Sequence, residues 1–286
     1  MALQHWFRFI RFSHTLFALP FAAVGYTMGL LEVQHFKWQT LLLVLLCMVT
    51  NRNAAMAFNR LIDLRIDALN PRTANREIPK RLIHPRAALI FVIVNSLLFI
   101  AACAALNRLT LILSPVALLT VFIYSYTKRF TWLCHYILGL GLALAPIGAF
   151  LAVTGYFSAT TIVLGTGVMC WVAGFDIIYA LQDEEFDRRH HLYSIPSRFT
   201  PQRAVLIARI SHLFTTLCFT AYIILYIPLV WQAYMALLLF SAVLIYQHCQ
   251  FYQNSKGIDG AFMLVNSINS TLFGSLLVLI LLLTQS

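Results

Sequence analysis

Charged side chains are scarce in this chain: Asp, Glu, Lys and Arg together make up 10% of its 286 residues. Soluble domains typically carry about 25% charged residues, so the sequence lacks the polar side chains that would cover a water-facing surface. Hydrophobic residues instead make up 60% of the chain, and the mean hydropathy is +0.80. This scarcity of charge excludes an ordinary soluble domain and indicates a membrane protein.

Closely spaced cysteines are also absent. The six cysteines lie singly in or near apolar stretches, with no Cys-x-x-Cys pair: Cys47, Cys103, Cys134, Cys170, Cys218 and Cys249. This pattern predicts neither a disulfide framework nor a zinc site. We interpret the cysteines as small apolar packing residues.

Long apolar runs dominate what is present, and a helix needs about 20 mostly apolar residues to cross a bilayer. Nine such runs occupy residues 12–32, 39–59, 87–106, 109–127, 135–154, 160–182, 203–224, 228–250 and 261–283. The first run lacks a small-residue cleavage site, so we expect a membrane span rather than a cleaved signal. The sequence predicts an all-α, polytopic membrane protein with nine transmembrane helices in a single domain over residues 1–286.

The net charge of +10 comes from basic residues that gather on one side of the predicted helices. If the N-terminus is cytoplasmic, 17 of the 20 Lys and Arg residues fall on the cytoplasmic side. Cytoplasmic loops of membrane proteins carry this excess, so the charge indicates topology rather than nucleic-acid binding. We expect a multi-pass protein of the inner (plasma) membrane whose functional face is cytoplasmic.

Eight of the ten acidic residues lie in two short stretches, residues 58–79 and 174–196, at the cytoplasmic ends of even-numbered runs. In the first stretch, Asn59, Asp63 and Asp67 recur every four residues and therefore share one helical face. In the second stretch, the residues expected to share a face are Asp176, Tyr179, Asp183 and Asp187.

Like charges four residues apart repel on a helix, so two such aspartate pairs require a counter-charge. Mg²⁺ typically takes one or two carboxylates and completes its shell with water and substrate phosphates. The pairs therefore predict Mg²⁺ ions that bind a diphosphate. The alternative is a pair of solvated loops whose acids pair with nearby arginines.

Basic residues in the cytoplasmic segments suit the same anionic ligand, because arginine and lysine bind phosphate oxygens. The candidates are Arg72, Arg76, Lys128 and Arg129. Each one alone could equally be a charge that determines topology. Together they are expected to offset the charge of a diphosphate.

Arg52 lies about two turns inside the second run, where a charge is costly unless it faces a polar cavity or a partner. Residues 52, 56, 59 and 63 fall along one helical face, so Arg52 should point the same way as the aspartate pair. We expect it to bind a carboxylate or the diphosphate; the alternative is a structural ion pair with Asp176. His14, near the first basic residues, is expected to line the mouth of the cavity.

These two stretches resemble the aspartate motifs of the UbiA superfamily of intramembrane prenyltransferases, N-D-x-x-D-x-x-x-D and D-x-x-x-D. Here the first motif runs from Asn59 through Asp63 to Asp67, and the second from Asp183 to Asp187. Further matches are RFSHTLFALPFA (11–22), PRTANR (71–76), YSYTKRFT (124–131), GLALAPIGA (141–149), and Asp176 with Tyr179.

The resemblance implies nine helices around a central cavity, with a cytoplasmic cap over the motif loops. It implies that Mg²⁺, held by Asn59, Asp63, Asp67, Asp183 and Asp187, binds a polyprenyl diphosphate. The prenyl group then passes to the ring of a hydroxy-aromatic acid in quinone biosynthesis. The residues expected at the substrates are Arg52, Arg72, Arg76, Tyr124, Lys128, Arg129, Asp176, Tyr179 and His14. Membrane lipid surrounds the protein, and no oligomeric state is implied.

Three departures bear on the acceptor. Arg60 stands where many members have a second motif Asp, Tyr193 where many hydroxybenzoate enzymes have Lys, and His14 where those enzymes commonly have Arg. The motif segments are most similar to a bacterial subgroup labelled hydroxybenzoate polyprenyltransferase, some members of which serve menaquinone synthesis. The acceptor is therefore either 4-hydroxybenzoate or a dihydroxynaphthoate.

Two other classes compete with this interpretation. A transporter could use Arg52 and Asp176 as an intramembrane substrate site, but both aspartate clusters face one side, which suits a one-sided active site better. A CDP-alcohol phosphotransferase would carry D-G-x-x-A-R, and this continuation is absent after Asp67 and Asp187.

Overall fold

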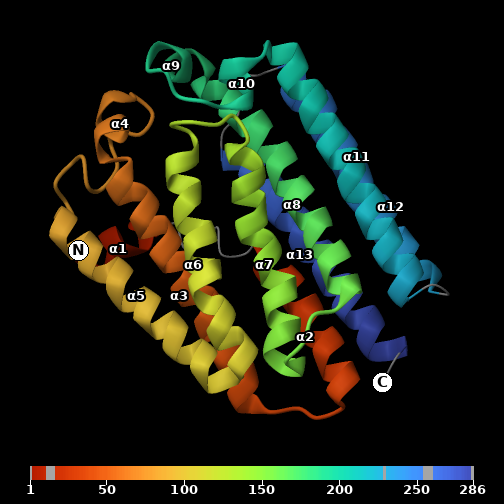
Figure 1. The fold of residues 1–286 in the computed structure, drawn as a ribbon. Helices are drawn as coiled ribbons and strands as arrows, with labels where there is room; N and C mark the ends of the chain where they lie inside the picture. Colours follow the sequence, from red (N-terminus) through yellow and green to blue (C-terminus); the bar gives the residue numbers. More distant parts are fainter. Residues whose placement is uncertain (1, 11–16, 228–229, 254–259, 285–286) are drawn as a thin grey trace. The chain divides into compact units, whose positions relative to one another are not determined.

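The computed structural model describes residues 2–10, 17–227, 230–253 and 260–284, and the regular elements within them are all helices (Figure 1). Eight of these helices are long and apolar enough to cross a membrane. They are α3 (Trp38–Ile62), α5 (Pro85–Leu106), α6 (Arg108–Thr127), α7 (Cys134–Thr154), α8 (Ala159–Ala180), α11 (Pro201–Tyr226), α12 (Trp231–Gln253) and α13 (Gly260–Thr284). The predicted all-helical, polytopic class is confirmed.

The first predicted run, residues 12–32, corresponds to α2 (Leu19–Val33), an apolar helix of 15 residues. At about 1.5 Å of rise per residue, it is shorter than the hydrocarbon core of a typical bilayer. The predicted run began at residue 12, and residues 11–16 lie outside the described part of the chain. Short helices occur beside the aspartate stretches, where the cap was expected: α4 (Leu64–Leu69), α9 (Glu184–Arg189) and α10 (Ile195–Arg198), besides α1 (Ala2–Phe9) near the N-terminus.

The chain forms two compact units: unit 1 consists of residues 1–15 and 37–126, and unit 2 of residues 16–36 and 127–286. Helix α2 thus belongs to a different unit from α1 and α3, its neighbours in sequence. The single domain over residues 1–286 stays a prediction.

Unit 1 is built on the pairing of α3 with α5. Ala54 of α3, Phe99 of α5 and Leu118 of α6 share a buried cluster. The rings of Phe58 and Phe122 lie 4.4 Å apart, centroid to centroid, and join α3 to α6. These contacts hold the helix that carries the first aspartate stretch.

Unit 2 is a closed circuit of helices, because α2 packs on α7, α7 on α8, α8 on α11, α11 on α12, α12 on α13, and α13 again on α2. Its core is aromatic and includes Trp171, Phe219, Phe240 and Phe273, all at most 2% exposed. Of the eight candidate spans, the one formed by α8 and its continuation is the most buried. The second aspartate stretch therefore begins on the most buried of the candidate spans.

Two glycines let helices of unit 2 approach closely. A Cβ atom on Gly25 of α2 would lie 2.1 Å from the Pro146 carbonyl oxygen, and one on Gly139 of α7 would lie 2.3 Å from the Met169 carbonyl oxygen. Small residues at such crossings are typical of membrane helices, which gain stability from close packing rather than from the hydrophobic effect. Leucines such as Leu238, Leu239 and Leu272 project outward instead, as lipid-facing side chains do.

Candidate active site

The first aspartate stretch lies in unit 1, where α3 passes into α4. The four-residue repeat continues across this junction, because Asp63 N donates to Asn59 O at 2.9 Å and Asp67 N to Asp63 O at 2.7 Å. The Asn59 side-chain amide donates to Asp63 Oδ2 at 3.2 Å. Asp63 and Asp67 are 1% and 3% exposed. The structure thus continues the four-residue repeat that the spacing predicted and joins the side chains of Asn59 and Asp63.

Arg76 holds the carboxylate of Asp67. Its Nη1 lies 2.7 Å from both Asp67 carboxylate oxygens, and the Thr73 hydroxyl donates to the Asp67 backbone carbonyl at 3.1 Å. The turn after α4 therefore folds back over the aspartate. Asp67 therefore pairs with a nearby arginine, as the alternative interpretation of the acidic stretches expected. In this structure Arg76 binds the Asp67 carboxylate.

Arg60, which replaces a motif carboxylate, is 4% exposed, and its Nη1 lies 3.8 Å from Glu77 Oε2. Glu77 follows Arg76 directly, so one short segment carries a partner for Arg60 and a partner for Asp67. Arg60 thus places a cation where many family members have a carboxylate. Its ion pair with Glu77 links α3 to the segment after α4.

The other expected residues of unit 1 are spread over different elements. Arg52 is half-buried on α3, beside Asn53, whose amide donates to Asn95 Oδ1 of α5 at 3.2 Å. Tyr124 is half-buried on α6, and Arg72 is exposed in the segment after α4. Their roles stay predictions. His14 lies outside the described residues.

The second aspartate stretch lies in unit 2 and corrects the expected helix geometry. Helix α8 ends at Ala180, a 3₁₀ turn covers Leu181–Asp183, and α9 begins at Glu184. A 3₁₀ turn advances about 20° more per residue than an α-helix. One α-helical face therefore does not run from Asp176 to Asp187, although Asp183 and Asp187 remain four residues apart.

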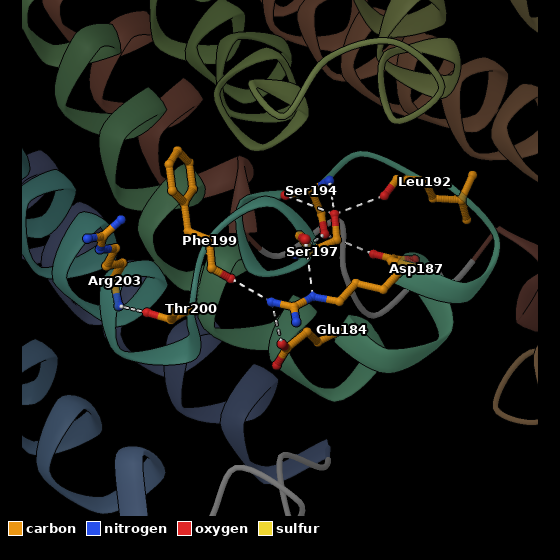
Figure 2. Close-up of polar contacts among 9 residues, drawn as sticks. Glu184, Asp187, Leu192, Ser194, Ser197, Phe199, Thr200 and Arg203 are labelled. Atoms are coloured by element: carbon orange, nitrogen blue, oxygen red, sulfur yellow. Dashed lines mark hydrogen bonds and ion pairs between the residues drawn. The ribbon is translucent and has the colours of Figure 1, made fainter.

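Asp187 is fixed by the segment that follows α9 (Figure 2). The Ser194 hydroxyl donates to Asp187 Oδ2 at 2.9 Å. Ser194 is also the N-cap of α10, in a capping box with Ser197. Arg188 secures the same segment, because its side chain donates to the carbonyl oxygens of Ser197 at 3.2 Å and Phe199 at 2.9 Å.

The basic residues after α6 also contact this segment, since Tyr193 N donates to Lys128 O at 2.7 Å. Lys128 is half-buried, whereas Arg129 is exposed. Tyr179, one turn after Asp176, is half-buried, and its carbonyl accepts from the Gln182 amide at 2.8 Å. Unit 2 thus gathers Lys128, Tyr193 and the second aspartate pair at the same ends of its helices.

Sequence reasoning missed His135 as a site residue. Its Nδ1 lies 2.7 Å from Asp176 Oδ2, and its Nε2 accepts from Ile195 N at 3.2 Å. His135 is 41 residues from Asp176 and 60 from Ile195, so no local spacing marks this contact. Its place at the start of an apolar run is the signal that the sequence offers.

The oxygen-bearing side chains of the two aspartate stretches can be compared with those that a divalent cation needs. Within the described part of the chain, no group of three or more His, Cys, Asp or Glu side chains is placed to hold an ion alone. The first stretch does supply two buried carboxylates, one of which, Asp63, lies within hydrogen-bonding reach of the Asn59 amide. Few carboxylates with the remaining positions left to substrate phosphates are typical of Mg²⁺ sites. The residues therefore fit Mg²⁺ bound together with a diphosphate, and do not form an all-protein cage.

Two curated proteins that are similar to this chain carry the same name. A curated protein from Saccharophagus degradans named 4-hydroxybenzoate octaprenyltransferase is 34% identical over 173 residues, which span 60% of this chain and 57% of that protein. A protein of the same name from Psychromonas ingrahamii is 28% identical over 265 residues, or 92% and 88% of the two chains.

Solved structures agree with the sequence relatives. The apo structure of a UbiA homologue from Aeropyrum pernix K1 matches with a TM-score of 0.83 at 31% identity, covering 93% of this chain and 98% of that one. A UbiA homologue from Archaeoglobus fulgidus, solved bound to GPP and Mg²⁺, shares the fold with a TM-score of 0.70 at 19% identity, covering 96% and 99%. Residues 18–277 match the UbiA prenyltransferase family, which confirms the resemblance: the chain belongs to that family.

Proposed function

We propose that this protein transfers a polyprenyl group from polyprenyl diphosphate to the ring of a hydroxy-aromatic acid in the biosynthesis of ubiquinone or menaquinone. The observation that carries the proposal is the pair of buried carboxylates, Asp63 and Asp67, held at the end of an apolar span. A second pair, Asp183 and Asp187, follows another apolar span. The relatives named 4-hydroxybenzoate octaprenyltransferase support the reaction class.

Asn59, Asp63, Asp67, Asp183 and Asp187 are the proposed ligands of Mg²⁺, and a neighbour of the same fold binds GPP and Mg²⁺. When bound, the cation supplies positive charge that stabilises the departing diphosphate. Arg76 orients the Asp67 carboxylate through its contacts with both oxygens. Arg72, Lys128 and Arg129 add positive charge where the diphosphate leaves.

In the proposed reaction, the bond between the allylic carbon and the diphosphate oxygen breaks, and its electron pair leaves with the diphosphate. A carbon of the acceptor ring bonds to the allylic carbon, and the ring then releases a proton. Arg52 is the proposed partner of the acceptor carboxylate. Asp176, with Tyr179 and Tyr124 at the substrates, is proposed to accept a proton or hydrogen bond from the acceptor phenol.

The membrane setting suits this chemistry. The donor tail and the prenylated product are both membrane-soluble, and apolar helices exclude the water that would quench an allylic cation. We infer that the protein resides in the inner membrane with its active site toward the cytoplasm, because the basic excess of the loops follows that orientation. Both aspartate stretches follow helices that would end on that side.

The test uses purified protein with one polyprenyl diphosphate and, separately, 4-hydroxybenzoate or 1,4-dihydroxy-6-naphthoate, with products resolved by mass. We expect a prenylated product and released diphosphate that require Mg²⁺ and are abolished by EDTA. Combined Asp63→Asn and Asp183→Asn substitutions should lower the rate by at least about 100-fold, because charge stabilisation of the leaving group is lost. Transfer that persists in the double variant would contradict the metal assignment. Liposome uptake without a covalent product would support a transporter instead.

A further inference from the structure

We propose that His135 is a positioning residue that fixes the orientation of Asp176 for the aromatic acceptor. The proposal rests on the transferase function proposed above. His135 lies in the second position of α7, and its side chain is 3% exposed, whereas the side chain of Asp176 is 20% exposed. The histidine is thus enclosed by protein, while the carboxylate that it contacts remains open to a ligand.

The contacts of His135 fix its tautomer. A backbone N–H can only donate, so the bond from Ile195 N requires Nε2 to be a bare acceptor. The single proton of the neutral imidazole is then on Nδ1, which lies 2.7 Å from Asp176 Oδ2. His135 therefore donates to Asp176. The bond to Oδ2 orients the carboxylate and leaves Oδ1 for the substrate.

The same histidine couples Asp176 to the second aspartate motif. Ile195 follows Ser194, whose hydroxyl donates to Asp187 Oδ2. Tyr193, on the other side of Ser194, is bonded to Lys128 through its backbone N–H. Three consecutive residues, 193–195, therefore connect a proposed metal ligand, a proposed diphosphate-binding segment and, through His135, the proposed acceptor-binding carboxylate.

Two conservative substitutions separate the bonds of His135. In His135→Asn the amide nitrogen lies near the Nδ1 position and can still donate to Asp176. In His135→Gln the amide lies near the Nε2 position, where its oxygen can still accept from Ile195 but the donor to Asp176 is lost. A residue that only supports the 193–195 segment would tolerate Gln better than Asn, and a residue that positions Asp176 would tolerate Asn better than Gln.

We expect His135→Asn to keep kcat within about threefold of wild type and His135→Gln to lower it by roughly 10- to 100-fold, the effect of losing a hydrogen bond to a charged group. The KM for polyprenyl diphosphate should stay within about twofold in both variants. The reverse order, equal losses or no loss in either variant would overturn the proposal.

A second measurement does not depend on turnover or on the variants folding. The ¹⁵N NMR spectrum of wild-type protein with labelled histidine should show His135 as the Nδ1–H tautomer with an unprotonated Nε2. A protonated Nε2 would overturn the proposal even if transfer is demonstrated. Absence of transfer in the wild-type protein, with the expected tautomer present, would instead refute the proposed transferase function.

Discussion

At the scale of single residues, the site depends on cations that hold carboxylates. Asp67 is 3% exposed and has both oxygens within 2.7 Å of Arg76 Nη1. A buried carboxylate is costly unless it is paired, so Arg76 stabilises the arrangement of the first motif before any substrate arrives. Arg60 and Glu77 form a second ion pair between α3 and the same segment. The segment after α4 is thus held by two charge pairs.

We predict that Arg76→Gln lowers the free energy of unfolding by about 2 kcal/mol, because it leaves the buried Asp67 without its charged partner. Lys80→Gln is the control: Lys80 is an exposed basic residue of the same segment, and its loss should change stability by less than about 0.5 kcal/mol. Thermal unfolding of the purified proteins in detergent measures both. Equal midpoints for the two variants would contradict the role given to Arg76.

At the scale of elements, close helix packing in unit 2 positions the second motif. Helix α8 is packed between α7 and α11, and Gly139 permits the α7 backbone to approach the Met169 carbonyl of α8. The contact depends on a backbone surface that any side chain would block. His135 lies one turn before Gly139 on α7, so the same packing sets its distance to Asp176.

Gly139→Ala should therefore destabilise the protein by about 1–3 kcal/mol, since its Cβ would lie 2.3 Å from a backbone oxygen that cannot move alone. Gly148→Ala on the same helix is the control, because nothing lies within 4 Å of its Cβ. There we expect no loss, or a gain of up to about 1 kcal/mol from helix propensity. Unfolding of the purified variants by a denaturing detergent measures the stability of each. A loss of stability in Gly148→Ala as large as that in Gly139→Ala would refute the packing argument.

At the scale of the whole molecule, the distribution of charge predicts the orientation in the membrane. The segment over residues 70–83 carries several basic residues, whereas the connection over residues 34–37 between α2 and α3 carries one, Lys37. The positive-inside rule then predicts that the first segment is cytoplasmic and the second is outside. The eight long apolar helices make the protein multi-pass in either orientation.

Cysteine labelling tests this orientation. In a cysteine-free background, His35→Cys should react with a membrane-impermeant maleimide in spheroplasts, and Lys80→Cys should react only after permeabilisation. Both positions are exposed, so accessibility within the fold does not bias the comparison. Labelling of Lys80→Cys in intact spheroplasts, with protection of His35→Cys, would invert the topology and place the aspartate stretches outside.

The sequence by itself determined the fold class, the helices and the first motif, because apolar length and four-residue spacing act locally along the chain. Asn59, Asp63 and Asp67 therefore follow one another through the helical backbone bonds that their spacing predicted. Only the tertiary structure decided that α2 joins unit 2, that Arg76 binds Asp67, and that a 3₁₀ turn interrupts the second motif. It alone also paired His135 with Asp176, because a contact across 41 residues depends on how α7 packs against α8.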